Sequence, residues 1–342
     1  MDGEPRPVEV AVESYRAAAA EIVAEYLSAR EPGPHLYDPL RAFMARDGKG
    51  LRPALCLAAC EAFGGAAGDA LQSAAAIELL HAAFLIHDDI EDDSEWRRGE
   101  PTLHVLHGVP IALNAGDALA VMCLRPLLDN VDRLGSRLAR SVLAEFQATM
   151  ERTVEGQAIE LGWRRDNTAE LTPVDYLDMI LHKTCAYTTI LPLRVGALIG
   201  SRGRADLDAI SQFGFSLGAA FQIKDDLLDL DADANDGNLM GDISEGKRTL
   251  MVIHSLRFAP PAARARVQAF LDRTGTERST DELREIVDVV DAAGSIAFAQ
   301  QYADALLAQA EERFDDAFAA CVPSPALRFL RDVIPFMTQR AR

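Results

Sequence analysis

Apolar residues recur at steps of three and four along almost the whole chain, and this period constrains the fold more than any other feature. In residues 70–88 it is carried by seven positions: Leu71, Ala74, Ala75, Ile77, Leu80, Phe84 and Leu85. This is the spacing of one face of an α-helix, whereas a half-buried β-strand alternates every two residues. Runs of alternating β-branched residues are absent from the sequence. The period therefore predicts an all-α fold.

Proline and glycine lie between the periodic segments, for example at residues 32–34, 64–65, 200–203 and 260–261. Because these residues favour turns over helix interiors, they predict about ten to thirteen helices. The 342 residues contain no long Ser/Gly-rich or Pro-rich linker, and no repeat with a period of 20–50 residues. We therefore expect one helical domain over residues 1–342, built as a single bundle.

The composition excludes several classes of protein. The formal net charge is −19, and a nucleic-acid-binding face would need a dominant basic stripe. Residues 1–10 lack the basic start and apolar run of a secretory signal. No uninterrupted apolar run approaches the ~18–20 residues of a membrane span, and the five cysteines are odd in number and scattered. We expect a cytoplasmic protein with no membrane span, in which Cys56 and Cys60 pack in the core.

Two acidic clusters each continue a strongly apolar helical segment. Both begin with the pattern D-D-x-x-D, which places the first and last aspartate on one helix face. Like charges at that spacing repel, and oxygen-only ligands select hard cations. The sequence therefore predicts Mg²⁺ sites, with six candidate ligands: Asp88, Asp89, Asp92, Asp225, Asp226 and Asp229. A solvated helix end would explain one such cluster, but it explains two less well.

Basic residues accompany both clusters. Arg97 and Arg98 follow the first cluster, Lys247 follows the second, and Lys183 interrupts an apolar segment. The Gly-punctuated turn at residues 48–53 precedes an expected helix, where backbone amides can bind an anion. Guanidinium groups suit bidentate phosphate contacts. Each basic residue alone is more often a surface charge, but together they predict a cavity for a polyphosphate with Mg²⁺.

Five motifs follow one another in a fixed order: G-K-G-L-R-P at 48–53, D-D-x-x-D and R-R-G-x-P-T at 88–102, K-T at 183–184, F-Q-x-x-D-D-x-x-D at 221–229 and G-D-I-x-E-G-K-x-T-L at 241–250. In this order they resemble the trans-prenyltransferases, the isoprenyl diphosphate (polyprenyl) synthase family. The resemblance covers about residues 38–253 by motif. It implies an isoprenoid synthase fold with helices around a deep central cavity, and a homodimer.

The resemblance also implies a reaction, the Mg²⁺-dependent head-to-tail condensation of isopentenyl diphosphate with an allylic diphosphate. By resemblance, Asp88 and Asp92 would hold two Mg²⁺ ions, and Asp225 with Asp229 a third. The allylic diphosphate would be bound by a further set: Lys183, Thr184, Gln222, Lys247 and Arg97. Isopentenyl diphosphate would be bound by Lys49, Arg52, His81 and Arg98. Mg²⁺ and cationic side chains would stabilise the charge that develops on the departing diphosphate, so Asp88, Asp92, Asp225, Lys183 and Arg97 are the expected catalytic residues.

Two features qualify this assignment. The family often has G-K where this chain has Gly237-Asn238, so one expected lysine of the allylic site is missing. His81 lies seven residues before Asp88 on the same helical stripe, which favours a phosphate-facing side chain over a buried, hydrogen-bonded histidine.

The product should grow away from Asp88 along its own helix, so residues one to three turns earlier would form the floor: Leu80, Ala83 and Phe84. At ~5.4 Å per turn, the Phe84 ring limits the depth one turn below the metal ions, whereas Ala83 leaves the neighbouring direction open. We expect a C20 product, geranylgeranyl diphosphate, with C15 farnesyl diphosphate as the alternative.

Two more distant classes of protein stay open. A class I terpene cyclase shares an apolar helical cavity and one D-D-x-x-D, but it has no need of Lys49, Arg52 and Arg98 to bind isopentenyl diphosphate. A non-catalytic partner subunit would typically have lost an Asp motif, and both motifs are intact here.

Overall fold

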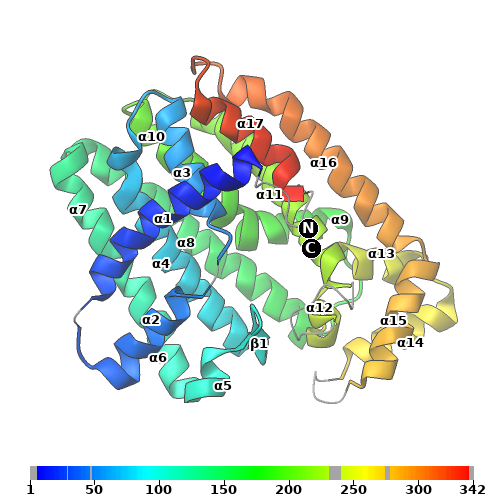
Figure 1. Cartoon of the computed structure of the whole chain (residues 1–342). Coiled ribbons are helices and arrows are strands. Elements are labelled where there is room, and N and C mark those ends of the chain that lie inside the picture. Colours follow the sequence, from blue (N-terminus) through cyan, green and yellow to red (C-terminus); the bar gives the residue numbers. More distant parts are fainter. Residues whose placement is uncertain (1–5, 29, 47, 231–239, 274–277, 339–342) are drawn as a thin grey trace.

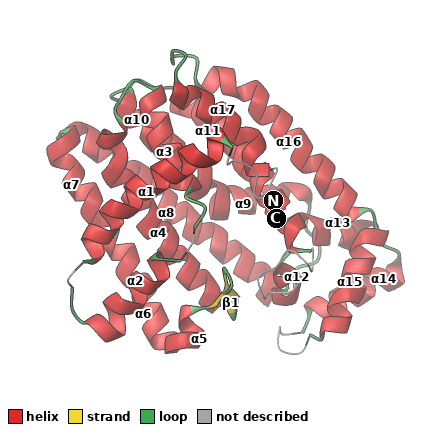
Figure 2. Cartoon of the chain, in the orientation of Figure 1, coloured by secondary structure: helices red, strands yellow, loops and turns green. Residues whose placement is uncertain are grey.

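The computed structural model describes residues 6–28, 30–46, 48–230, 240–273 and 278–338 (Figure 1). The described residues are helical almost throughout (Figure 2). Their α-helices are α1 (Pro7–Leu27), α2 (Asp38–Met44), α3 (Leu51–Ala62), α4 (Ala67–Glu91), α5 (Leu103–His107), α6 (Val109–Met122), α7 (Leu124–Leu134), α8 (Ser136–Arg165), α9 (Pro173–Ile180), α10 (Leu191–Gly200), α11 (Leu207–Asp229), α12 (Gly241–Glu245), α13 (Leu250–Phe258), α14 (Pro261–Leu271), α15 (Thr280–Ala292), α16 (Ser295–Ala317) and α17 (Pro325–Thr338). Two π-helical segments, η1 (Gly33–Tyr37) and η2 (Leu181–Ile190), complete the helical elements.

The all-α prediction is confirmed, with two differences in detail. The described helices outnumber the ten to thirteen expected, because short helices such as α5 and α12 have only five residues each. Such helices are too short to show a full apolar period. The described residues also include one small hairpin, in which β1 (Trp96–Arg97) pairs antiparallel with β2 (Glu100–Pro101).

Helix α4 lies inside the bundle and packs against α1, α3, α6 and α7 (Figure 1). Its small residues Ala74, Ala75 and Ala76 are fully buried, so neighbouring helices approach it closely. The helix ends in the first Asp motif. Helix α11 ends in the second Asp motif and packs against α16 and η2. The two apolar helices therefore carry both Asp motifs into the interior of one bundle.

Two glycines allow α10 to lie directly on α3. A Cβ on Gly196 would lie 2.1 Å from the carbonyl oxygen of Cys56, and a Cβ on Gly200 would lie 2.1 Å from that of Cys60. Both cysteines are fully buried free thiols. They pack in the core, as expected. Among the described residues, no group of three or more His, Cys, Asp and Glu side chains has the geometry to hold a metal ion without further ligands.

Two helical stretches, residues 67–91 and 109–134, are long and apolar enough to cross a membrane by length and composition alone. Both contain polar residues at intervals, so a search for an uninterrupted apolar run does not reveal them. In the most apolar 18 residues of the first stretch, 67% are buried within the bundle, as in the core helix of a globular protein. The second stretch is only 44% buried and presents an apolar face to the outside.

Candidate active site

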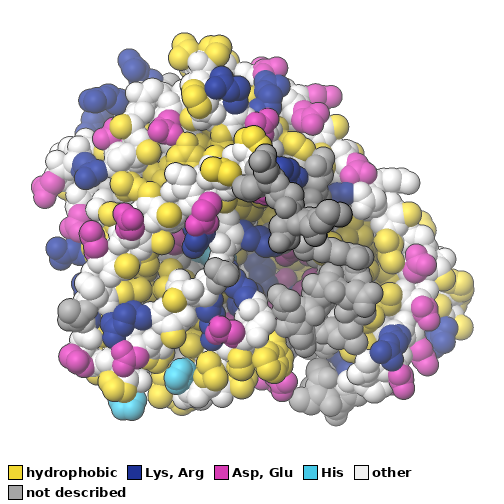
Figure 3. Space-filling view, viewed as in Figure 1, with side chains coloured by type: hydrophobic (Ala, Val, Ile, Leu, Met, Phe, Trp, Pro, Cys, Tyr) yellow, Lys and Arg dark blue, Asp and Glu magenta, His cyan; other side chains and the backbone are white. Residues whose placement is uncertain are grey.

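A cavity of about 1420 Å³ lies between the ends of α4 and α11 and is bounded by α3, α8, η2 and α12. Lys/Arg and Asp/Glu side chains lie next to one another in the hollow at the centre of the face shown in Figure 3. Most of the predicted site residues line the cavity: Lys49, Arg52, His81, Phe84, Asp88, Arg97, Arg98, Lys183, Thr184, Gln222, Asp225, Asp226, Asp229 and Lys247. Four others lie behind its surface: Leu80, Ala83, Asp89 and Asp92.

Asp88, on the last turn of α4, faces cations from other elements. The Nζ atom of Lys183 lies 3.2 Å from its Oδ1, and Arg97 lies 3.5 Å from its Oδ2. Burial alone would raise the pKa of Asp88, but Lys183, Lys247 and Arg97 outweigh this and hold the pKa well below its usual value. Asp88 is therefore ionised at neutral pH and is suited to bind a cation.

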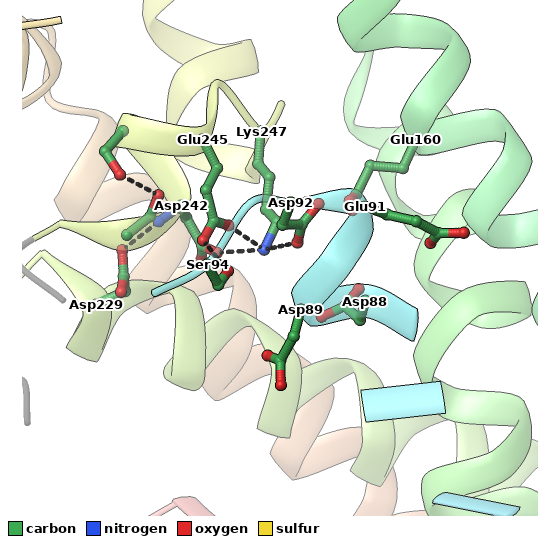
Figure 4. Close-up of polar contacts among 12 residues, drawn as sticks. Asp88, Asp89, Glu91, Asp92, Ser94, Glu160, Asp229, Asp242, Glu245 and Lys247 are labelled. Atoms are coloured by element: carbon green, nitrogen blue, oxygen red, sulfur yellow. Dashed lines mark hydrogen bonds and ion pairs between the residues drawn. The ribbon is translucent and has the colours of Figure 1, made fainter. Parts of the chain in front are cut away.

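Asp92 closes the same motif, and its side chain is only 1% exposed. Arg164 on α8 donates a hydrogen bond to its Oδ1, and the Nζ atom of Lys247 lies 2.8 Å from its Oδ2. Lys247 also pairs with Glu245 at 2.6 Å, so it lies between carboxylates from two parts of the chain (Figure 4). The structure thus joins the first Asp motif directly to the motif at 241–250.

The middle aspartate of each motif holds a neighbouring side chain. Asp89 accepts a hydrogen bond from Arg97, and its burial raises its pKa to about 7. Asp226 accepts hydrogen bonds from the Tyr176 hydroxyl and the Gln222 amide, each at 2.7 Å. Burial raises the pKa of Asp226 well above its usual value. These two carboxylates fix groups around the cavity.

Asp229 ends α11 and meets α12. Its Oδ2 accepts a hydrogen bond from the backbone amide of Asp242 at 2.9 Å. Burial, with the nearby Asp242 carboxylate, raises the pKa of Asp229 to about 7. Carboxylates from α4, α11 and α12 therefore crowd together at this end of the cavity (Figure 4). Such crowding calls for positive charge, which a divalent cation would supply.

These carboxylates fit one mode of Mg²⁺ binding, in which the ion is bound together with a phosphorylated ligand. No three metal-ligating side chains in the described ranges converge into a closed cage. Mg²⁺ is usually bound by one or two carboxylates, with waters and substrate phosphates completing its coordination. Sparse carboxylates facing a cavity lined by lysine and arginine are therefore suited to Mg²⁺ that arrives with a phosphorylated ligand.

The opposite side of the cavity is basic and aromatic. Arg52 lies 3.1 Å from the Nε2 atom of His81 and donates a hydrogen bond to the Thr188 hydroxyl at 2.9 Å. Its guanidinium also lies 4.9 Å from the ring centre of Tyr187, which stacks on His81. Burial and the nearby Arg52 lower the pKa of His81 well below its usual value, so the imidazole is neutral. His81 thus combines both expectations, since it is buried and still lines the cavity.

Arg97 and Arg98, in the hairpin β1–β2, point in different directions. Arg97 reaches the carboxylates of α4, whereas the guanidinium of Arg98 lies against Gly48, where a Cβ would be 3.1 Å from its Nη1. Arg46 fixes the hairpin by donating a hydrogen bond to the Pro101 carbonyl at 2.9 Å and pairing with Glu100 at 3.0 Å. The motif R-R-G-x-P-T therefore separates two basic groups that are adjacent in sequence.

Helix α8 supplies three residues that the sequence motifs did not indicate. Gln157 donates a hydrogen bond to Glu91 at 2.5 Å, Glu160 pairs with Lys183 at 2.7 Å, and Arg164 binds Asp92. Their spacing of three and four residues places them on one face of α8, which is a signal that the sequence does contain.

Lys183 itself lies on the π-helix η2, and π turns are frequent at functional sites. Helix α8 approaches η2 closely because Gly156 has no side chain. A Cβ at that position would lie 2.3 Å from the backbone nitrogen of Lys183. This close contact allows Glu160 and Lys183 to pair.

Of the three predicted floor residues, Phe84 lines the cavity and contacts a ring from another element. Its ring centre lies 5.5 Å from that of Tyr187 in an edge-to-face contact. Leu80 and Ala83 are at most 1% exposed and are not among the residues that line the cavity. Tyr187 comes from η2, so the sequence of α4 alone could not reveal it. Asn238, where the family often has lysine, lies outside the described residues.

The chain matches the family model Polyprenyl synthetase over residues 33–290. It belongs to that family. The motif-based prediction is therefore confirmed, and the protein is a prenyltransferase with the isoprenoid synthase fold. This assignment favours the synthase over the terpene cyclase, and the two intact Asp motifs argue against a non-catalytic subunit.

Similar proteins agree with the family. The chain is 37% identical over 270 residues to a short chain isoprenyl diphosphate synthase of Methanothermobacter thermautotrophicus, covering 78% of this chain and 80% of the relative. It is 32% identical over 315 residues to a geranylgeranyl diphosphate synthase of Sulfolobus acidocaldarius, covering 91% and 93%. The crystal structure of geranylgeranyl pyrophosphate synthetase from Pyrococcus horikoshii superposes with a TM-score of 0.86 at 29% identity, over 98% of each chain.

Proposed function

We propose that the protein condenses isopentenyl diphosphate with an allylic diphosphate in a Mg²⁺-dependent reaction whose main product is C20 geranylgeranyl diphosphate. The observation that supports this most strongly is the lining of one cavity. Both Asp motifs meet at one end, cations lie on either side, and the Phe84–Tyr187 ring pair lines the same cavity. The names of the Sulfolobus and Pyrococcus relatives favour the same chain length.

The allylic diphosphate is proposed to bind at the Asp motifs. Asp88, Asp92 and Asp225, with Asp229, are the proposed Mg²⁺ ligands, whereas Asp89 and Asp226 orient neighbouring side chains. Bound Mg²⁺ would stabilise the negative charge that develops on the departing diphosphate. The protein cations of this site add to that stabilisation, because they lie where the charge appears. They are Lys183, Lys247 and Arg97, with Thr184 and Gln222 as neutral donors.

Isopentenyl diphosphate is proposed to bind on the other side, between α3, α4 and the hairpin. Lys49, Arg52 and Arg98 offer cationic donors there, and neutral His81 offers a hydrogen-bonding nitrogen. The aromatic ring of Tyr187 contacts both His81 and Phe84, so apolar surface lies next to this site, where it would help to keep water from the reacting carbons. A nucleophilic side chain is not needed, since the double bond of isopentenyl diphosphate attacks the allylic carbon.

One assay tests this proposal. Purified protein should be incubated with isopentenyl diphosphate, Mg²⁺ and allylic primers of C5, C10 and C15, and the products separated by chain length. We expect a C20 diphosphate from each primer. A C15 diphosphate as the longest product would support the farnesyl alternative. Hydrocarbon products alone would support a cyclase, and the absence of any product would contradict the synthase.

A smaller side chain at the proposed floor of the cavity should lengthen the product. Phe84→Ala removes the ring that contacts Tyr187, so the chain can grow past the present floor, and we expect products longer than C20 by mass spectrometry. Phe84→Tyr keeps a ring of similar size and is the matched control, which should still yield C20. An unchanged product length in Phe84→Ala would place the floor elsewhere.

We propose a homodimer whose interface is the exposed apolar face of α5, α6 and α7. Eight aliphatic residues of this face are 40–68% exposed, whereas aliphatic residues are usually buried. They are Val105, Leu106, Val109, Leu113, Val121, Leu124, Leu128 and Val131. Large exposed apolar patches are rare on monomeric proteins, and where they occur they mark interaction sites. A second copy of the chain is the partner that the family resemblance implies.

Leu128→Glu should therefore convert the dimer to a monomer, because it places a charge in the apolar interface. The molar mass is measured by light scattering after size-exclusion chromatography. Val322→Glu is the control, since Val322 is 73% exposed but follows α16, away from this face. It should stay dimeric. A wild-type protein that is monomeric at micromolar concentration would contradict the proposal.

We also propose a cytoplasmic location. All five cysteines are free thiols and four of them are buried, which is typical of proteins from a reducing compartment. The single domain over residues 1–342 stays a prediction, which the family match over residues 33–290 supports.

A further inference from the structure

The loop between α12 and α13 carries Lys247, the lysine that reaches Asp92 across the cavity. Gly246, directly before it, has a left-handed backbone with φ of 77°, a conformation that favours glycine. Lysine has a long, flexible side chain, so its reach depends on where the loop places its backbone. What holds this loop is therefore part of the geometry of the allylic site.

Arg248, directly after Lys247, is one of two arginines that grip the loop. Its side chain is only 2% exposed, which is rare for arginine. It donates hydrogen bonds to the Asn167 side chain at 2.6 Å, to the Thr168 carbonyl at 3.4 Å and to the Gly246 carbonyl. Arg248 thus ties the loop to the segment that follows α8.

Arg278 grips the loop from the other side. Its guanidinium donates to the Ser244 carbonyl in α12 and to three carbonyls at the end of α14: Phe270 at 3.2 Å, Leu271 at 3.2 Å and Arg273 at 2.6 Å. A Cβ on Gly246 would lie 2.6 Å from its Nη2, so the guanidinium lies directly against the loop. One planar group therefore connects the end of α14 to the end of α12.

Carbonyl groups take the place of carboxylates around both arginines. Within the described ranges, neither guanidinium has a carboxylate partner among the ion pairs. The last carbonyls of a helix carry partial negative charge, and a guanidinium fork with five donors can bind several of them at once. Burial and neighbouring arginines lower the pKa of Arg248 and of Arg278 to about 10, so both are charged at neutral pH.

We propose that Arg278 and Arg248 are positioning residues, which fix the end of α12 and the loop that follows it (residues 244–249) so that Lys247 can bind the allylic diphosphate. This inference rests on the proposed role of Lys247. Neither arginine contacts the predicted isopentenyl diphosphate ligands, which lie on α3, α4 and the hairpin. The two arginines therefore act on one substrate and not on the other.

Arg278→Ala tests this selectivity in steady-state kinetics with farnesyl diphosphate and isopentenyl diphosphate as separately varied substrates. We expect the KM for farnesyl diphosphate to rise about tenfold, while the KM for isopentenyl diphosphate stays within about twofold. A merely structural role would lower the active fraction and the melting temperature but change neither KM. Arg284→Ala is the matched control, since Arg284 is a mostly exposed arginine of α15 that pairs with Asp281. It should leave both KM values unchanged.

Arg278→Lys is a second variant that tests the inference even if Arg278→Ala does not fold. It keeps the positive charge at the helix ends but cannot donate to four carbonyls at once, so the same selective rise in KM should appear, only smaller. If both KM values rise equally, or neither changes, in the folded variants, the inference is wrong.

A double variant tests whether Arg278 acts through Lys247. In a Lys247→Ala background, adding Arg278→Ala should not raise the KM for farnesyl diphosphate further, because the side chain it positions is gone. A further rise of the full size would contradict the inference. If Lys247→Ala alone leaves this KM unchanged, the proposed role of Lys247 fails. A normal effect of Lys247→Ala with no effect of Arg278→Ala overturns only the positioning role.

Discussion

Asp88→Asn should lower turnover by about three orders of magnitude or more while the protein stays folded, since metal-assisted charge stabilisation is among the largest catalytic effects. The substitution keeps the size of the side chain but removes the negative charge that attracts Mg²⁺. It also removes the partner of Lys183, which keeps a second carboxylate, Glu160, at 2.7 Å. The folded state should therefore survive.

Asp93→Asn is the matched control for this experiment. Asp93 lies in the same acidic cluster, but its side chain is 85% exposed. Its backbone has φ of 55°, a conformation that asparagine tolerates. Turnover in this variant should stay within about twofold of wild type, as for most exposed positions away from a site. Near-normal turnover in Asp88→Asn, measured with circular dichroism to verify folding, would refute the proposed metal site.

Lys183→Ala should lower kcat about 10²-fold to 10³-fold, which is the typical cost of removing one donor to a developing negative charge. Lys183 is the cation that bridges α4 and α8, since it contacts both Asp88 and Glu160. Without it, Glu160 is left buried with a side chain only 6% exposed, so the melting temperature should also fall.

The loss of folding stability has to be separated from the loss of catalysis. Lys183→Arg keeps the charge and should restore the melting temperature, but the planar guanidinium cannot occupy the same position, so kcat should recover only in part. Lys224→Ala is the control lysine, because Lys224 pairs with Asp304 and does not line the cavity. Wild-type kcat in folded Lys183→Ala would contradict the assignment.

The hydrogen bonds of the middle aspartates refine the interpretation of the D-D-x-x-D motifs. Asp89 fixes Arg97, and Asp226 fixes Tyr176 and Gln222. From sequence, all six aspartates are candidates for metal binding, and the spacing of each motif places only its first and last aspartate on one helix face. The structure adds what the middle aspartates contact, because Arg97 and Tyr176 come from other elements of the chain.

Local pattern was sufficient for the fold class and for many of the charged residues that line the cavity. The helical period, the position of both Asp motifs at the ends of apolar helices, and the order of the five motifs are all properties of short segments. The structure places fourteen of the predicted residues on one cavity because those segments converge, as the chemistry of a shared substrate requires. The small hairpin and the shortest helices were missed, since such elements carry too few residues for a pattern.

The sequence by itself thus determined the helical bundle, the prenyltransferase family and the groups that carry charge. Only the tertiary structure decided which side chains meet. It brought Gln157, Glu160 and Arg164 of α8 to the first Asp motif, placed Lys247 against Asp92, and set Tyr187 of η2 against Phe84. The physical reason is that each of these contacts joins elements far apart in the chain, and their packing depends on volumes and close approaches, such as that at Gly156, which no local spacing encodes.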